Sequence, residues 1–256
     1  MILGIVGSPR KAGRTNQLVD AALKGAHDQG EPTTKIYLVD YALKAYTGQD
    51  GSGDAYTYCP EALSQLCEAA DAIIIGAPVY SGDINGLTKD FMDTVRIANA
   101  SGKPALGIAV AGGSGKGLLS GVQSIYHFFY HKQMRAIDPT PISRFNLEAM
   151  LLTLIESGAK LVDLVAAATP FAGETWDARW PEVLAYYTTL PYLNADPLDE
   201  FLMLADQLLQ ISTTGPVADA RRLYIRAVNM KSEGDREGAA RAAVQSYQLL
   251  FFPPKS

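Results

Sequence analysis

Short apolar runs alternate with helical patterns through the first half of the chain. Continuous runs occupy residues 2–6, 35–39, 72–76 and 105–111, and a shorter run follows at 134–137. Runs of this kind are typical of strands buried on both faces of a parallel sheet. Between them, apolar residues recur at helical spacing, as in Leu18, Val19, Ala22 and Ala26. The alternation predicts an α/β fold with a doubly wound, five-stranded parallel sheet, which binds ligands at the carboxyl ends of its strands.

From about residue 145 the alternation stops and only helical periodicity remains. It is clearest at 147–154 and 198–208, and Gly234-Asp235 separates two last helices as a stop signal and an N-cap. The stretch 169–196 is rich in Pro, Trp and Tyr and gives no clear assignment. We therefore predict an α/β domain at 1–144 and an α-helical extension at 145–256 that packs on it.

Composition narrows the class of protein. Hydrophobic residues make up 48 % of the chain and charged residues 19 %, as in a folded soluble protein. A formal net charge of -5 weighs against nucleic acid or an anionic membrane as a partner. No apolar window approaches the roughly 20 residues of a membrane span, and the first apolar run is too short for a signal peptide. These features predict a cytoplasmic protein.

A polar loop joins the first strand to the first helix, with the sequence GSPRKAGRTN at residues 7–16. Its small residues leave main-chain N–H groups free, and a helix N-terminus favours an anion. Cations and side-chain donors come from Ser8, Arg10, Lys11, Arg14, Thr15 and Asn16. The spacing fits neither a Walker loop nor a dinucleotide fingerprint. The loop indicates a phosphate cradle, with an ordinary polar turn as the alternative.

Two further loops follow strands at the same edge of the predicted sheet. GAPVYSGDING at 76–86 has a constrained backbone, and Tyr80 offers a face for a flat heterocycle, although a generic loop with a buried tyrosine is the alternative. The glycine density of AGGSGKG at 111–117 indicates backbone close to a ligand, or else a flexible surface loop. Three such loops at one edge favour a single binding site.

Residues 1 to about 137 resemble the NAD(P)H-dependent FMN reductases, near the branch that includes iron–sulfur flavoproteins. The resemblance rests on GSPRK at 7–11 with Gly13 and Thr15, and on ADAIIIGAPVY at 70–80. It continues through Gly82, Gly86, Lys89, Phe91, Asp93, Lys103-Pro104 and Gly112-Gly113. It implies a flavodoxin-like fold that binds FMN. Members of the family are commonly dimers or tetramers, so a homodimer or homotetramer is expected.

The resemblance also implies which residues contact FMN. The phosphate side would comprise Ser8, Pro9, Arg10, Gly13, Arg14, Thr15 and Asn16. The isoalloxazine would be bordered by Pro78, Val79, Tyr80, Ser81, Gly82 and Ile84, with Gly112, Gly113, Ser114 and Gly115 on its other side. No catalytic side chain is expected, because the flavin itself accepts the hydride.

The sequence departs from the family in its cysteines. The iron–sulfur branch carries a compact run of cysteines between the second and third strands, where this chain has only Cys59 and Cys67. Two thiolates of one chain cannot ligate a cluster, so no iron–sulfur cluster and no metal are expected unless subunits share a cluster. His127 and His131 share a helical face but lack an acidic partner. Cys59 is expected to be partly exposed and Cys67 buried.

A second departure is Thr94, which stands where the family has arginine after Phe-x-Asp. The leading hypothesis is an FMN-dependent oxidoreductase that passes electrons from NAD(P)H to a small acceptor. The alternative is a flavodoxin-like electron carrier that serves protein partners. A flavin-free scaffold is the third.

Overall fold

The computed structural model describes residues 1–47 and 58–252. Five strands form its parallel sheet in the order β2-β1-β3-β5-β6. They are β1 (Ile2–Val6), β2 (Thr33–Tyr37), β3 (Ala72–Tyr80), β5 (Pro104–Ala111) and β6 (Arg135–Ile137). This order is that of flavodoxin-like sheets, with the switch point between β1 and β3. The predicted fold class is therefore confirmed.

Within the described residues, the sheet has seven strands rather than the predicted five. The additional ones are β4 (Asp83–Ile84), antiparallel to β3, and β7 (Ile142–Ser143), parallel to β5. Two residues are too short to produce a recognisable period in the sequence. Two strands also differ in length from the predicted apolar runs. Strand β2 is followed by a 3-10 turn at Leu38–Asp40, and β3 continues to Tyr80 because it pairs with β4.

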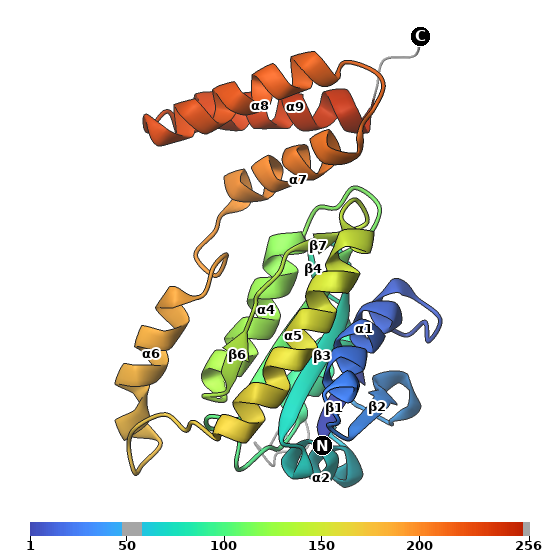
Figure 1. The fold of residues 1–256 in the computed structure, drawn as a ribbon, viewed down its shortest axis with the longest axis vertical. Helices are drawn as coiled ribbons and strands as arrows, with labels where there is room; N and C mark the ends of the chain where they lie inside the picture. The colour runs from blue at the N-terminus through green and yellow to red at the C-terminus, as the bar shows by residue number, and fades with distance from the viewer. Residues whose placement is uncertain (48–57, 253–256) are drawn as a thin grey trace.

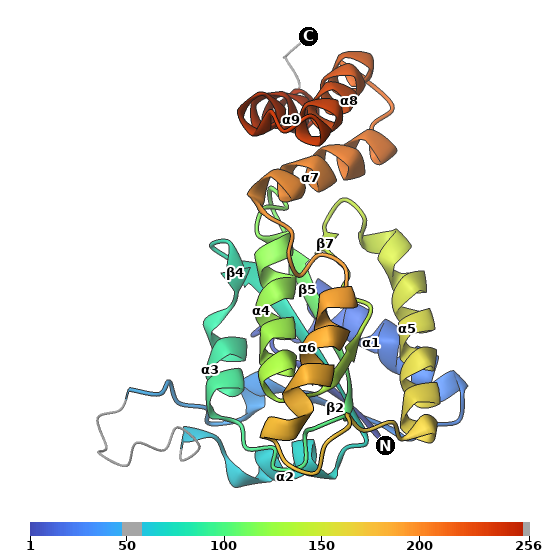
Figure 2. The same cartoon turned by 90° about the vertical axis from the view of Figure 1, so that its left-hand side faces the viewer.

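Helices cover both faces of the sheet (Figures 1 and 2). Residues of α1 (Arg14–Asp28) and α5 (Leu147–Ala167) share one core cluster with Ile74. On the opposite face, α2 (Glu61–Ala69), α3 (Gly86–Thr94) and α4 (Leu118–His131) pack with Ile73 and Ile75. Successive strand residues point to opposite faces, which explains why the continuous apolar run at 72–76 is buried on both sides.

Helices α1 and α5 cross at two glycines. A Cβ atom at Gly25 would lie 1.9 Å from the carbonyl oxygen of Ile155, and one at Gly158 would lie 1.9 Å from that of Ala22. The two backbones can approach so closely only because neither glycine carries a side chain. Helix α5 is thus a layer of the α/β sandwich, and the helices outside the sandwich begin with α6. The division at 144/145 remains a prediction.

Helix α6 (Trp180–Thr189) packs along the sheet edge formed by β6. A short 3-10 helix at Asp177–Arg179 precedes it. The hydroxyl of Tyr186 donates to the carbonyl of Ala136 over 2.6 Å, and that of Tyr187 donates to Met134 over 2.8 Å. Segment 169–196, which the sequence left unassigned, therefore protects the edge strand.

The last three helices lie beyond the carboxyl ends of the strands, as Figures 1 and 2 show. They are α7 (Pro197–Ile211), α8 (Val217–Ser232) and α9 (Arg236–Phe251), which we call the helical cap. The expected break between α8 and α9 is confirmed: Gly234 has a φ of +88°, and the Asp235 side chain caps α9. Among the helices of the described residues, none combines the length and apolar character that a membrane span requires.

Candidate functional site

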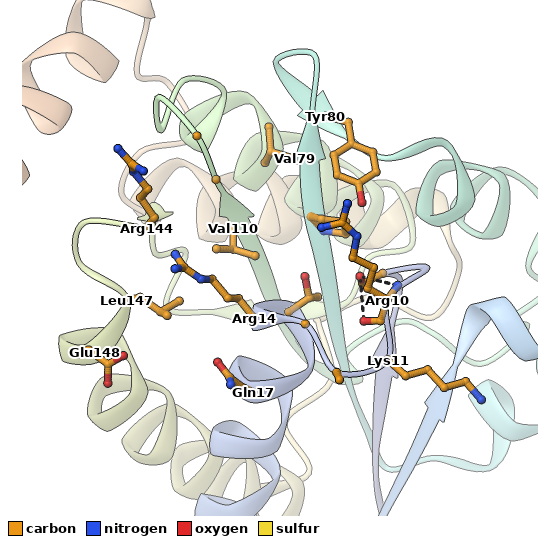
Figure 3. A pocket seen from close by; sticks show the side chains of 17 residues that line it. Arg10, Lys11, Arg14, Gln17, Val79, Tyr80, Val110, Arg144, Leu147 and Glu148 are labelled. Carbon is orange, nitrogen blue, oxygen red and sulfur yellow. Dashed lines mark hydrogen bonds between the residues drawn. The ribbon is translucent and has the colours of Figure 1, made fainter. Parts of the chain in front are cut away.

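A cavity of about 1000 Å³ opens at the carboxyl ends of β1, β3 and β5 (Figure 3). This volume is at the upper end of the range for ligand pockets, roughly 300–1000 Å³. Four segments line it: the β1–α1 loop, the end of β3, the glycine loop after β5 and the start of α5. The cavity thus lies where a doubly wound sheet places its ligand.

The N-terminus of α1 presents free hydrogen-bond donors to this cavity. Its N-cap, Gly13, has no capping side chain, and its first turn contains no acidic residue. Among the described residues, the main-chain N–H groups of Arg14 and Thr15 have no acceptor. Free N–H groups at a helix N-terminus, together with the helix dipole, form an anion site.

The Thr15 hydroxyl is a further donor at this helix end. Thr15 is only 2 % exposed, and its hydroxyl has no hydrogen-bond partner in the described part of the chain. In that part, no fully buried side-chain oxygen or nitrogen lacks a partner. The hydroxyl oxygen must therefore be exposed to the cavity that Thr15 lines. Such a group satisfies its hydrogen bond when an anion occupies the cradle.

Positive charge gathers around this cradle although the chain as a whole carries a net charge of -5. Arg10, Arg14 and Arg144 line the cavity, and within the described residues none of them pairs with a carboxylate. Arg10 extends beneath Tyr80, whereas Arg14 extends toward the side where Arg144 lies (Figure 3). Glu148 is a lining carboxylate on that side. The surplus of arginine favours an anionic ligand.

Lys11 does not add to this surplus at the cradle. Its ammonium group lies 2.6 Å from a carboxylate oxygen of Asp40 and 5.1 Å from the centre of the Tyr37 ring. Figure 3 shows the side chain pointing away from the cavity. Lys11 therefore ties the β1–α1 loop to the segment after β2.

The other walls of the cavity are apolar or bare backbone. Val79 and Val110 line it, and Tyr80 stands at its rim with 48 % of its surface exposed. A Cβ atom added at Gly112 or Gly113 would meet nothing within 4 Å. Protein packing therefore does not demand glycine at Gly112, whereas a flat ligand approaching the backbone would; at Gly113 a φ of +48° by itself favours glycine. A phosphate cradle beside such walls fits FMN.

The structure brings together most of the residues singled out in the sequence. Ten of the expected FMN contacts line the cavity: Ser8, Arg10, Gly13, Arg14, Thr15, Pro78, Val79, Tyr80, Gly112 and Gly113. Lys11 of the β1–α1 loop lines it as well. Contrary to expectation, residues 78–80 belong to a strand rather than a loop. Whether these residues contact FMN remains a prediction.

Seven of the expected residues do not line the cavity: Pro9, Asn16, Ser81, Gly82, Ile84, Ser114 and Gly115. The Asn16 amide is engaged by the sheet, because its oxygen accepts from Lys35 over 2.9 Å and from Tyr37 over 3.0 Å. Gly82 faces α4, where its carbonyl accepts from Ser120. Ile84 is buried in the core, and Ser114 and Gly115 contact the helical cap.

Outside the loop at 7–16, sequence reasoning missed five lining residues: Gln17, Val110, Arg144, Leu147 and Glu148. Two of these, Leu147 and Glu148, begin α5, which the proposed division at 144/145 separated from the α/β domain. No local signal marks Arg144, because it enters the site through the two-residue strand β7, which is too short to produce a period in the sequence.

The cysteines lie away from the cavity. Cys59 is 7 % exposed, so the expectation of partial exposure is wrong: it packs in the core with Leu63. Burial raises the pKa of the Cys59 thiol, and full burial raises that of Cys67 to about 12. Within the described residues, no group of three or more His, Cys, Asp or Glu side chains is arranged to hold a metal ion.

Comparison with known proteins adds independent findings. The family model described as NADPH-dependent FMN reductase matches residues 1–143. An iron–sulfur flavoprotein of Methanocaldococcus jannaschii is 32% identical over 151 residues, which cover 54% of this chain and 78% of that protein. An NADPH azoreductase of a Bacillus species is 30% identical over 122 residues, 48% of this chain and 64% of that protein. A solved archaeal flavodoxin superposes with a TM-score of 0.48 at 18% identity, covering 65% of this chain and 99% of its own.

Proposed function

Because the chain belongs to the NADPH-dependent FMN reductase family, whose members are flavin-dependent oxidoreductases, we propose that its cavity binds FMN and that the bound flavin passes electrons from a pyridine nucleotide to a small acceptor. One observation carries this proposal: the free donors of the α1 N-terminus face the same cavity as the bare glycines after β5. FMN supplies the hydride-accepting chemistry when bound. The protein holds, orients and shields it.

The phosphate of FMN would be held by the cradle. The main-chain N–H groups of Arg14 and Thr15 and the Thr15 hydroxyl would donate to it, and Arg10 would balance its charge. The ring would lie along Val79 and Tyr80 on one side and the Gly112-Gly113 backbone on the other. A terminal phosphate seated on a helix N-terminus leaves no path for the adenylate of FAD, so FMN is the expected flavin.

The far side of the cavity suits the electron donor. Arg14 and Arg144 line that side without carboxylate partners among the described residues, and pyridine nucleotides carry phosphates that arginine binds well. The family description and the azoreductase relative both name NADPH. We therefore propose that the nucleotide phosphates contact these arginines while the nicotinamide meets the flavin.

The protein would work without an iron–sulfur cluster, although a relative is called an iron–sulfur flavoprotein. Cluster ligation takes four thiolates, and the whole sequence has two cysteines, both buried. Iron and acid-labile sulfide analysis of anaerobically purified protein tests this point. A homodimer or homotetramer remains a proposal from the family resemblance, and light scattering of the purified protein tests it.

Equilibrium titration with three flavins tests the proposed site. FMN should bind with one molecule per chain. Riboflavin, which lacks the phosphate, should bind at least about tenfold more weakly, because charge-assisted hydrogen bonds contribute roughly 1.5–3 kcal/mol each. FAD should bind poorly. Equal affinity for riboflavin and FMN would refute the cradle.

Steady-state oxidation of NADPH and NADH by the FMN-loaded protein separates the enzyme from the electron carrier. Multiple turnovers with a quinone or an azo dye as the acceptor support the reductase. Turnover only in the presence of a redox protein would favour the flavodoxin-like carrier.

A further inference from the structure

The glycine loop between β5 and α4 is held from outside the α/β sandwich. This loop comprises residues 112–117, and its first two glycines line the cavity. The helical cap lies directly against it, at the carboxyl end of the sheet (Figures 1 and 2). Buried residues of the cap, including Leu204, Leu208 and Tyr247, form one core cluster with Ala111 and Leu118 at the two ends of the loop.

Glu200 of α7 fixes the end of the loop where α4 begins. One carboxylate oxygen accepts from the N–H of Gly117 over 3.0 Å, and the other accepts from the N–H of Leu119 over 3.1 Å. Gly117 is the N-cap of α4 and has no side chain with which to cap it. The carboxylate therefore supplies the missing cap and places a negative charge at a helix N-terminus, where it is stabilising.

Tyr247 of α9 fixes the middle of the loop. Its hydroxyl donates to the carbonyl of Ser114 over 2.9 Å, and the residue is 1 % exposed. The next residues are held as well: Gly115 lies against Leu204, and the Lys116 ammonium lies 5.3 Å from the ring centre of Phe201. Each consecutive residue from 114 to 117 thus contacts the cap.

The cap also holds the segment from β7 to α5, on the opposite wall of the cavity. The Ser143 hydroxyl lies 2.6 Å from the side-chain oxygen of Gln207. The Arg144 guanidinium lies 4.9 Å from the ring centre of Phe145 and 5.5 Å from that of Phe251. The cap therefore contacts two separate segments that border the proposed flavin.

We infer that the helical cap positions the ring-side wall of the cavity, with Glu200 and Tyr247 as the positioning residues. A loop with four glycines among six residues has a high entropy when free. Anchoring it before the ligand arrives removes that entropic cost from binding. This inference rests on the proposed function: it makes the affinity for the flavin ring, but not for the phosphate, depend on the cap.

Two neighbouring hydroxyls of α9 offer a matched test. Tyr247→Phe removes the hydrogen bond to the loop, whereas Ser246→Ala removes a buried hydrogen bond of 2.8 Å to Ala220, inside the cap. Tyr247→Phe should raise the Kd for FMN about threefold to tenfold, and Ser246→Ala less than about twofold. Glu200→Ala, which frees two N–H groups, should raise it at least about tenfold.

Two further measurements separate positioning from general destabilisation. The affinity for inorganic phosphate should be the same in all variants, because the cradle lies on another loop. Amide hydrogen exchange of peptides covering 112–117 should accelerate in Tyr247→Phe and Glu200→Ala but not in Ser246→Ala. If the wild-type protein binds FMN and both loop-directed variants match Ser246→Ala, the inference is overturned. If the wild-type protein does not bind FMN, the proposed function fails and the inference with it.

Discussion

Replacing Gly158 by alanine should destabilise the protein, although alanine is the better helix former. The new Cβ would lie 1.9 Å from the carbonyl oxygen of Ala22 and 2.8 Å from its carbonyl carbon. Both atoms belong to the backbone of α1, so no side-chain rotation relieves the clash. The two helices must move apart, and α1 carries the proposed phosphate cradle at its start.

The magnitude follows from two opposing effects. Glycine to alanine in a helix interior gains about 1 kcal/mol in helix propensity. Overpacking costs about 1–3 kcal/mol, and a clash between backbones is at the upper end of this range. The net loss should therefore be about 2 kcal/mol. For a chain of this size, the midpoint of thermal unfolding should fall by roughly 4–8 °C.

Thermal unfolding followed by circular dichroism measures this shift, and Gly86→Ala is the matched control. Gly86 is the first residue of α3, and a Cβ there would meet nothing within 4 Å. The control should be neutral or slightly stabilising. Gly25→Ala should resemble Gly158→Ala, and the double variant should cost less than the sum because one separation relieves both contacts. A Gly158→Ala protein as stable as the control would refute the close crossing.

Three other predictions concern named side chains. Thr15→Val should weaken FMN binding about tenfold to a hundredfold by calorimetry, whereas Thr15→Ser should keep most of the affinity, since it keeps the hydroxyl; equal affinity in all three proteins would remove Thr15 from the site. Neither Cys59 nor Cys67 should react with iodoacetamide at pH 8 in the native protein, because burial raises both pKa values; rapid alkylation seen by mass spectrometry would contradict this. The Asp196 pKa is held below its usual value by the hydrogen bond from Arg236, so its stabilising effect is present above the ordinary carboxyl pKa and is lost as the pH falls through the lowered one. In acid titrations, Asp196→Asn should lack this component.

The sequence predicts the buried sheet well because burial on two faces leaves a local signal. Ile73, Ile74 and Ile75 are apolar whichever face each occupies, so the strand is recognisable without knowledge of its neighbours. The end of the same strand cannot be recognised in this way. Its extension to Tyr80 depends on pairing with the two residues of β4, and a pair that short has no period of its own.

The candidate site shows the same limit. The type and position of Asn16 suit a phosphate ligand, but Lys35 and Tyr37 reach its amide only once β2 lies beside β1. Arg144 was overlooked for the converse reason. It enters the cavity because β7 pairs with β5, a contact between segments about 30 residues apart that no local pattern reports. The local sequence shows which chemical groups a segment carries, whereas tertiary packing decides where each side chain points.

The tyrosines of α6 have a consequence for how the chain can be shortened. The carbonyl groups that Tyr186 and Tyr187 cover belong to the β6 edge of the sheet, where uncovered groups invite pairing with another chain. A fragment that stops at residue 144 would lack both tyrosines and also α5. During synthesis, the tyrosines that cover this edge follow it in the chain by 50 and 53 residues. We expect such a fragment to aggregate through β6. The shortest fragment that avoids this aggregation should extend to the end of α6 at Thr189.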